Sequence, residues 1–203
     1  MTLTEISSFV LASIILAFTP GPDNIFVIVT SLGQGFKTSL KFIFGLCTGI
    51  ILHTALIVLG VSTFVSQSEY GLILLKYFAV AYLLYLACKT FLHRHDEIQL
   101  KTGTKVDNYF VRGFIMNISN PKVLMFFLAF FPQFANLNQP GFQFRLLLLG
   151  VMFILVTFSV FSMIAWLSVK GTEKFINHPK FGLYINWLAI MVFVSVSLLF
   201  LLN

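Results

Sequence analysis

Long runs of apolar residues, separated by short polar segments, divide the chain into six candidate membrane spans. The runs lie near residues 5–32, 40–65, 71–92, 110–132, 143–169 and 181–202. Each is at least about 20 residues long, which is the helix length needed to cross about 30 Å of hydrocarbon. The pattern therefore predicts an all-α polytopic membrane protein with six transmembrane helices.

Two of these runs are interrupted by helix-breaking residues well inside the run. Thr19-Pro20-Gly21-Pro22-Asp23-Asn24 cuts the first run, and Asn120-Pro121-Lys122 cuts the fourth. In lipid every backbone N–H and C=O needs a partner, so a broken helix persists only where protein or a water-filled cavity covers the break. Matching breaks in two halves of a chain indicate a transporter's binding site. We expect the first and fourth helices to be broken near the midplane, around such a site.

The longest polar connection separates the third run from the fourth and divides the chain into halves. We expect residues 1–95 to form a first three-helix repeat, residues 96–108 a cytoplasmic linker, and residues 109–203 a second three-helix repeat. With three spans in each half, the second half must enter the membrane in the opposite direction from the first. The spacing therefore predicts two inverted repeats.

Composition and charge agree with a chain that lies in a bilayer. Of the 203 residues, 58% are hydrophobic and only 10% are charged, whereas soluble domains are about a quarter charged. The net charge of +6 does not indicate nucleic-acid binding, because the basic residues are scattered between apolar runs. Most of them lie in or beside the connections after the first, third and fifth runs: Lys37, Lys41, Lys89, Arg94, Lys101, Lys105, Arg112, Lys170, Lys174 and Lys180. The positive-inside rule then places these connections in the cytoplasm and both termini outside.

Asp23 is an acid deep inside an apolar run, directly after the first break. Because Pro22 suits the first position of a new half-helix, Asp23 would lie in its first turn, where the positive end of the helix dipole favours a carboxylate. An ionised group within a membrane still costs about 2.5–3.5 kcal/mol on insertion scales, and it is a candidate functional group by default. The alternative is a structural cap inside the bundle.

Lys122 is the more demanding residue of the two. Asn120 is a predicted N-cap and Pro121 the first helical residue, so Lys122 would stand at the positive end of a half-helix, where a cation is unfavourable. It also lies about ten residues from either end of its run, roughly 15 Å away at 1.5 Å per residue. Lys122 therefore needs a partner, either Asp23 or an anionic group on a substrate. A purely structural Lys–Asp pair is the alternative.

The two breaks together would suit a small zwitterion. The predicted substrate-binding residues are Pro20, Gly21, Pro22, Asp23, Asn24, Asn117, Asn120, Pro121 and Lys122. Lys122 and the helix N-termini would hold a carboxylate, and Asp23 an amine.

Asp23 and His53 are the predicted proton-coupling residues. His53 shares one helical face with Gly45 and Gly49, at spacings of four residues. This face predicts a close helix approach, with His53 either relaying protons near the break or bonded to a neighbouring Ser or backbone carbonyl.

Other chemistries have little support in the sequence. Cys47 and Cys88 have no CxxC spacing and are interpreted as small apolar residues, so no disulfide, redox role, metal site or cofactor is expected. Ser159, Ser162, Asn186 and Trp187 would line a path or hold helices together. The alternatives left open are a metal-ion exporter and a membrane-embedded redox or scaffold protein. The oligomeric state stays open, with a homodimer as one option.

The chain resembles the LysE/RhtB family of bacterial amino-acid exporters, which includes homoserine, threonine, leucine and lysine efflux types. The resemblance rests on Pro20-Gly21-Pro22-Asp23, on Gly33, Gly45 and Gly49, and on Asn120-Pro121-Lys122. It implies a secondary transporter rather than an enzyme, exporting amino acids across the bacterial cytoplasmic (inner) membrane by proton antiport. Alternating access around the central site is expected from the two repeats, because one half can rock against the other. The two proline motifs would supply the two halves of the central site. With one acid at the core, a neutral amino acid or its lactone is the preferred cargo over a dibasic one.

Overall fold

A computed structural model describes residues 1–19, 21–65, 69–94, 106–135, 139–170 and 179–202. Within these residues the regular structure is entirely helical, which confirms the all-α prediction for this part of the chain. The helices are α1 (Leu3–Phe18), α2 (Pro22–Gln34), α3 (Phe36–Val65), α4 (Glu69–Leu92), α5 (Tyr109–Ile118), α6 (Pro121–Ala129), α7 (Phe131–Ala135), α8 (Phe142–Val169) and α10 (Pro179–Leu202). Pro20 and most of the predicted linker lie outside the described residues.

Helices end and restart at both predicted breaks. The axis turns by 61° between α1 and α2, and by 52° between α5 and the segment Pro121–Ala135. Pro22 and Pro121 each begin the helix that follows, where the missing N–H and fixed φ of proline carry no penalty. Each break therefore places a fresh helix N-terminus inside an otherwise apolar segment.

Two helical stretches are long and apolar enough to cross a bilayer, namely Phe36–Gly60 and Phe142–Val169. Each bent pair would add one span, which makes up to four among the described residues. Helices α4 and α10 have 24 residues each, or about 36 Å at 1.5 Å per residue. Six spans and an inverted repeat stay predictions.

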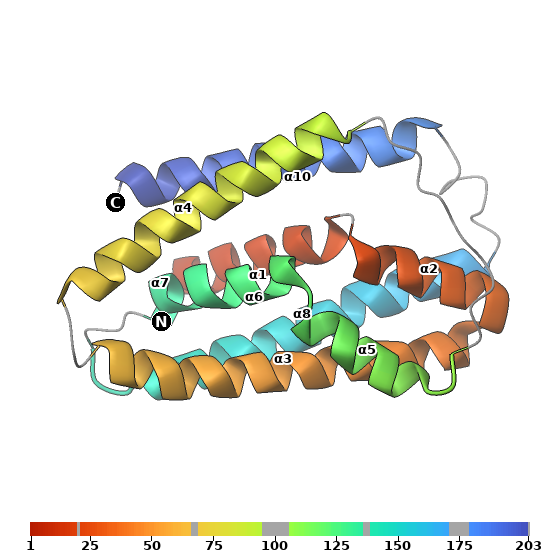
Figure 1. Ribbon diagram of the computed structural model, residues 1–203, viewed down its shortest axis with the longest axis horizontal. Coiled ribbons are helices and arrows are strands. Elements are labelled where there is room, and N and C mark those ends of the chain that lie inside the picture. Colours follow the sequence, from red (N-terminus) through yellow and green to blue (C-terminus); the bar gives the residue numbers. More distant parts are fainter. Residues whose placement is uncertain (20, 66–68, 95–105, 136–138, 171–178, 203) are drawn as a thin grey trace.

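The arrangement gives the bundle two distinct ends (Figure 1). Both chain termini lie at one end, on the left, whereas α2 ends and α3 and α5 begin at the other. The exposed side chains of Lys37 and Lys41 on α3, Arg112 on α5 and Lys170 after α8 belong to that second end. Basic residues thus gather at the end opposite the termini, which is the asymmetry on which the predicted orientation depends.

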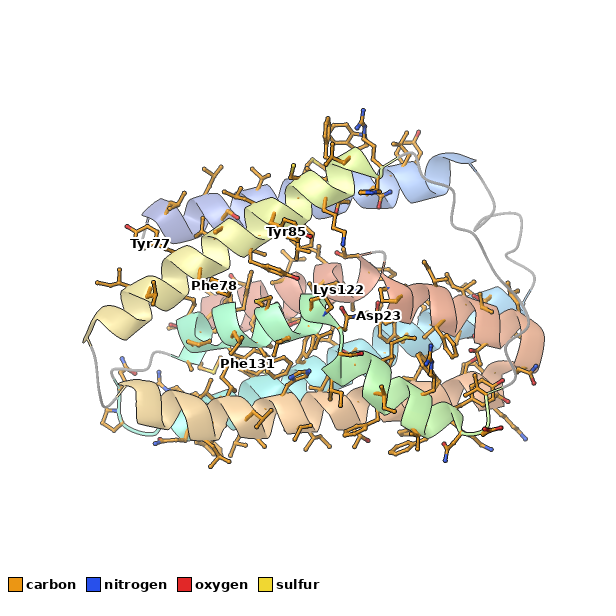
Figure 2. All side chains as sticks on the ribbon, viewed as in Figure 1. Asp23, Tyr77, Phe78, Tyr85, Lys122 and Phe131 are labelled. Carbon is orange, nitrogen blue, oxygen red and sulfur yellow. The ribbon has the colours of Figure 1, made fainter. Side chains whose placement is uncertain are left out.

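The outer surface of α4 is apolar and aromatic. Tyr77, Phe78 and Tyr85 project from this helix (Figure 2), and each is about half exposed. Helix α4 packs along α10, and the pair forms a layer beside the other helices. Exposed aromatic and aliphatic side chains on this scale suit contact with lipid tails rather than with water.

Glycines bring α3 and α5 into backbone contact. A side chain on Gly45 would collide with the carbonyl of Phe110, and one on Gly113 with the carbonyl of Phe42. Small residues let helices approach this closely in membranes, so the predicted role of Gly45 agrees with the structure. The contact holds α5, and the break that follows it, against α3.

The apolar interior consists of two clusters that meet at the first break. One is rich in phenylalanine and includes Phe126, Phe127 and Phe153, and the other surrounds Phe42 and Phe161. Leu16 belongs to the first cluster and Ala17 to the second. The last turn of α1 therefore lies at the junction between them.

Candidate functional site

The second break is closed by its own residues. Asn120 is the N-cap of α6, and its Oδ1 accepts a hydrogen bond from the Lys122 N–H at 3.0 Å. The Asn120 carbonyl accepts from the N–H groups of Val123 and Leu124, both at 3.1 Å. These bonds satisfy the N–H groups that a helix N-terminus leaves free, as the Asn-Pro-Lys motif predicted.

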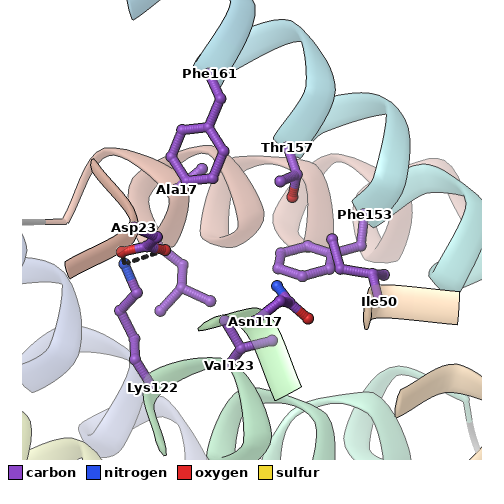
Figure 3. A pocket seen from close by; sticks show the side chains of 10 residues that line it. Ala17, Asp23, Ile50, Asn117, Lys122, Val123, Phe153, Thr157 and Phe161 are labelled. Atoms are coloured by element: carbon purple, nitrogen blue, oxygen red, sulfur yellow. Dashed lines mark hydrogen bonds and ion pairs between the residues drawn. The ribbon is translucent and has the colours of Figure 1, made fainter. Parts of the chain in front are cut away.

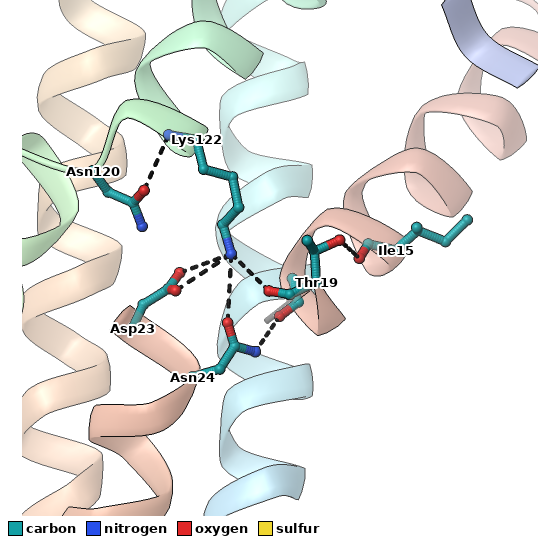
Figure 4. A network of polar contacts seen from close by, with 7 residues as sticks. Ile15, Thr19, Asp23, Asn24, Asn120 and Lys122 are labelled. Carbon is teal, nitrogen blue, oxygen red and sulfur yellow. Dashed lines mark hydrogen bonds and ion pairs between the residues drawn. The ribbon is translucent and has the colours of Figure 1, made fainter. Parts of the chain in front are cut away.

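The Lys122 side chain crosses to the first break (Figure 4). Its Nζ lies 3.3 Å from both carboxylate oxygens of Asp23. It also donates to the Thr19 carbonyl at 3.0 Å and to Asn24 Oδ1 at 3.4 Å. Thr19 is the C-cap of α1, so the ammonium meets the negative end of one helix although its own backbone belongs to the positive end of another. These contacts explain how a lysine is accommodated at the N-terminus of α6.

At the first break, the carbonyl end of α1 and the amide end of α2 differ in their hydrogen-bond partners. Asn24 Nδ2 donates to the Ala17 carbonyl at 2.7 Å, while the Thr19 N–H donates to Ile15 at 2.9 Å. Helix α2 has Gly21 as its N-cap and receives no hydrogen bond from a capping side chain. The carbonyl end of α1 is therefore paired by Asn24 and Lys122, whereas the amide end of α2 lacks a side-chain cap.

Gly21 gives the ion pair its space. A Cβ at this position would lie 2.6 Å from Asp23 Oδ1 and 3.2 Å from Lys122 Nζ. Both distances are too short for van der Waals contact, whereas the φ of −165° is extended backbone that any residue adopts. Glycine is thus needed here for room rather than for conformational freedom.

The Asp23–Lys122 pair is almost completely removed from solvent. The side chains are 4% and 9% exposed, respectively. Charges in such a place attract each other strongly, yet the cost of desolvating them offsets much of the gain. A buried pair is therefore a weak source of stability, and removing one partner leaves the other charge uncompensated.

A small cavity adjoins this pair (Figure 3). Asp23 and Lys122 lie at one side of it, and Asn117 and Thr157 at another. The rest of its wall is apolar: Leu16, Ala17, Ile50, Val123, Phe153 and Phe161. The space open to water is about 10 Å³, on the scale of one water molecule. A space of this size has no room for an amino acid.

Lys122 also lines a second cavity of similar size. That cavity is apolar apart from Lys122 and Tyr82, and its walls come from α1, α4 and α6: Leu16, Leu83, Leu86, Met125, Phe126 and Phe130 complete it. Leu16 and Lys122 therefore line both spaces. A movement of the Lys122 side chain would change both.

Unpaired polar atoms lie in the wall of the first cavity, on Asn117 and Thr157, and at the second break, on Asn120. Asn117 Oδ1, Asn120 Nδ2 and Thr157 Oγ1 are buried without a hydrogen-bond partner among the described residues. Buried polar atoms are rarely left unpaired, so each exception needs an explanation. A polar ligand that enters the cavity would supply the missing partners.

His53 lies beside the second break but lines neither cavity. Its Nε2 is 3.5 Å from the Asn117 carbonyl, a long contact, and its ring stacks on Phe127 with centroids 5.2 Å apart. Gly49, on the same face of α3, leaves room for the Asn117 side chain, because a Cβ there would lie 2.5 Å from Asn117 Oδ1. The structure therefore places His53 against a backbone carbonyl and next to the break. This position is compatible with a proton relay and with a structural contact to the carbonyl.

The structure brings most of the predicted site residues together. Asp23, Asn24 and Lys122 share one network, Asn120 caps the adjoining helix, and Asn117 lines the cavity. Pro22 and Pro121 begin their helices with exposed side chains. Among the described residues, no three His, Cys, Asp or Glu side chains lie close enough to hold a metal ion.

Thr157 is the cavity residue that the sequence reasoning missed. It belongs to the buried stripe of α8 with Gly150 and Phe153, and this periodicity was the available signal. Ser159, two residues further on, is exposed. Asn186 and Trp187 instead hold α10 to the end of α4, through the Arg94 carbonyl and the Phe91 ring.

The comparisons with known proteins cover nearly the whole chain. The family model for LysE type translocators matches residues 14–203. A homoserine/homoserine lactone efflux protein of Salmonella typhimurium is 32% identical over 183 residues, which cover 89% of this chain and 87% of that protein. A membrane protein of Bacillus subtilis, YrhP, is 28% identical, with 82% and 83% covered. A leucine efflux protein of Salmonella choleraesuis is 27% identical, with 66% and 64% covered. No solved structure matches.

Proposed function

Because this chain belongs to the family of LysE type translocators, we propose that it is a secondary transporter that exports amino acids or close derivatives. The two relatives with functional names are efflux proteins rather than enzymes, and YrhP is named as a membrane protein. We place the protein in the bacterial cytoplasmic membrane, with both termini outside. The basic residues collected at the opposite end of the bundle support this orientation.

The observation that carries the proposal is the Asp23–Lys122 pair, which joins the two breaks beside a small cavity. A cargo with a carboxylate and an amine can replace each charge of this pair with one of its own. The cargo carboxylate would bind Lys122, the uncapped N-terminus of α2 and Asn120 Nδ2, and the cargo amine would bind Asp23. In the absence of cargo, Asp23 and Lys122 would then neutralise each other. The pair would be part of the binding site rather than only a structural bridge.

The cavity has to open for this exchange. With about 10 Å³ of free space, it cannot hold an amino acid in the present conformation. We propose that the two halves of the chain move relative to each other, so that the site faces each side of the membrane in turn. Lys122 and Leu16 line both small cavities. A relative movement of the two halves that displaced these side chains would join the two cavities.

A neutral cargo fits the charge balance of the site. Asp23 and Lys122 carry one charge each, so an amino acid zwitterion leaves no charge uncompensated. A dibasic cargo would need a second carboxylate, and the described cavity walls hold Asp23 as their acid. The names of the two efflux relatives, which concern homoserine or its lactone and leucine, agree with this preference.

Proton coupling would arise from competition for Asp23. Its carboxylate can bind either the amine of the cargo or a proton, so each excludes the other from the site. We therefore propose Asp23 as the coupling group. His53, next to the second break, is the candidate relay.

Counterflow in liposomes tests the function. Purified protein is reconstituted, the vesicles are loaded with unlabelled homoserine, leucine or lysine, and uptake of labelled homoserine is measured with and without a pH gradient. We expect exchange with the neutral amino acids, stimulation by the gradient, and loss of gradient-driven transport in Asp23→Asn, which keeps the shape of the side chain. No exchange of any of these cargoes by folded protein would refute the proposal. Gradient-driven transport by Asp23→Asn at the wild-type rate would remove Asp23 from coupling.

A further inference from the structure

Hydroxyl groups on the helices of this protein follow a regular pattern. A serine or threonine side chain in a membrane helix usually satisfies its hydroxyl by donating to the carbonyl four residues earlier. Nine side chains in the described residues do this, with distances of 2.6–3.2 Å: Ser13, Thr19, Ser31, Ser39, Thr48, Thr54, Ser119, Ser168 and Ser197. A buried helix hydroxyl with no hydrogen-bond partner at all is therefore an exception that needs its own explanation.

Thr157 is such an exception, and it lies at the cavity. Its side chain belongs to a residue that is 4% exposed, and its Oγ1 has no partner among the described residues. Figure 3 shows the hydroxyl directed away from α8 and into the cavity. Ser162, one turn further along α8, also has an unpaired hydroxyl, but it does not belong to the cavity wall. The Thr157 hydroxyl is thus free for a ligand.

Asn117 lines the same side of the cavity from α5. It is 3% exposed, and its Oδ1 has no partner and rests against Gly49. An amide and a hydroxyl can together donate to and accept from one oxygen atom. Around them the wall is apolar, formed by Ile50, Phe153 and Phe161. This part of the cavity is therefore polar but uncharged.

We propose that Thr157, together with Asn117, is the specificity-determining pair that binds a hydroxyl or carbonyl oxygen on the cargo side chain. The inference rests on the proposed function, because it assumes that Asp23 and Lys122 hold the amino and carboxylate groups. A cargo bound there directs its side chain toward the opposite side of the cavity, where Thr157 and Asn117 lie. A short side chain with one oxygen satisfies them, and an aliphatic one leaves them unpaired.

The experiment compares two cargoes that differ by one hydroxyl. Homoserine and 2-aminobutyrate share the same carbon chain, so the ratio of their transport efficiencies (kcat/KM, from counterflow) measures recognition of the oxygen. We expect the wild type to prefer homoserine by about tenfold, the scale of one well-formed hydrogen bond. Thr157→Val keeps the shape of the side chain and should bring the ratio close to one, mainly through a higher KM for homoserine. Thr157→Ser keeps the hydroxyl and should restore the preference.

Ser159→Ala is the matched control, since Ser159 is on the same helix and exposed; it should leave the ratio unchanged. If Thr157→Val does not fold, Thr157→Ala makes the same comparison. An unchanged ratio in the folded variant, an equal loss for both cargoes, or a wild type that transports both equally well would overturn the inference while leaving the transporter function intact. A wild type that transports neither cargo, nor any other amino acid, would instead refute the proposed function.

Discussion

The break between α1 and α2 and the break between α5 and α6 begin with similar proline motifs but differ in how their polar groups are satisfied. At the second break, Asn120 provides acceptors for three N–H groups of α6. At the first break, α2 has no capping side chain, and the α1 carbonyl of Thr19 is paired by Lys122. The backbone at the second break is capped by the residues of that break, whereas the backbone at the first depends on a side chain supplied by the second.

This difference indicates which break a ligand would change. The second break is capped by its own residues, so its backbone needs no hydrogen-bond partner from another helix. Helix α6 can therefore hold the backbone of Lys122 in a fixed position. The first break loses its main partner whenever Lys122 binds something else, and its free helix N-terminus then needs an anion. We expect cargo binding to rearrange the region around Asp23 more than that around Asn120. Substitutions that affect one break more than the other test this difference between them.

Lys122→Ala should have the largest effect. It leaves Asp23, the Thr19 carbonyl and Asn24 Oδ1 without their shared donor. Removing one partner of a buried ion pair costs about 3–5 kcal/mol, so we expect a clearly lower free energy of unfolding in detergent and transport at background level. Lys37→Ala, an exposed lysine on α3, is the control. Wild-type stability and transport in Lys122→Ala would contradict the dependence of the first break on the second.

Exchanging the two charges should not restore transport. In the double variant Asp23→Lys with Lys122→Asp, a cation stands at the uncapped N-terminus of α2 and an anion faces the Thr19 carbonyl. The cation opposes the dipole of α2, and the anion, although favoured by the N-terminus of α6, can no longer pair the carbonyl end of α1. We expect counterflow at background level, with stability above that of Lys122→Ala because a pair of opposite charges is retained. Substantial exchange by the double variant would mean that the pair matters and the helix ends do not.

Gly21→Ala should act on the first break alone. The added Cβ would lie 2.6 Å from Asp23 Oδ1 and force the carboxylate to move, while the backbone conformation stays accessible to alanine. We expect transport efficiency to fall about tenfold with about 1 kcal/mol lost in stability, a typical value for a single substitution. Gly33→Ala, further along α2 with no atom within 4 Å of a new Cβ, should leave both unchanged. Equal behaviour of the two variants would argue against the tight fit at Gly21.

Asn120→Ala should have the smallest effect of the four. It removes the N-cap of α6, which costs about 1 kcal/mol, but it also removes a buried Nδ2 that has no partner among the described residues. If Nδ2 binds the cargo carboxylate, the KM should rise about threefold, within the range of one hydrogen bond. Thermal unfolding and counterflow on the same preparation separate the two contributions. A larger loss than in Lys122→Ala would reverse the proposed roles of the breaks.

Much of the site could be predicted from local sequence rules. Pro22 and Pro121 mark helix starts because proline lacks the N–H that an interior position requires, and Asn120 is a capping residue for the same local reason. Lys122 required a partner because of its depth and its place at a helix N-terminus. These arguments use only neighbouring residues and the length of a span, so they hold whatever the packing.

Thr157 shows where such rules stop. Ser159 and Ser162 are on the same helix with the same hydrogen-bonding group. The periodicity of α8 indicates that Thr157 faces the interior, but it does not indicate what Thr157 faces there. What differs is the direction of each side chain relative to α3 and α5, which depends on how the helices pack. The role of the Thr19 carbonyl could not be predicted either. Every residue has a backbone carbonyl, so only the packing of another helix shows which one meets a donor.

By itself, then, the sequence determined that the chain is helical, apolar along most of its length and broken at two motifs, because hydropathy acts within one span and proline and capping act within one or two helical turns. It also determined that Asp23 and Lys122 each needed compensation. Only the tertiary structure decided that they compensate each other, across 99 residues of chain, and that Lys122 joins the negative end of α1. Those contacts depend on the close crossing of α3 and α5 at Gly45 and Gly113, which positions the second break, and on packing between residues far apart in the chain.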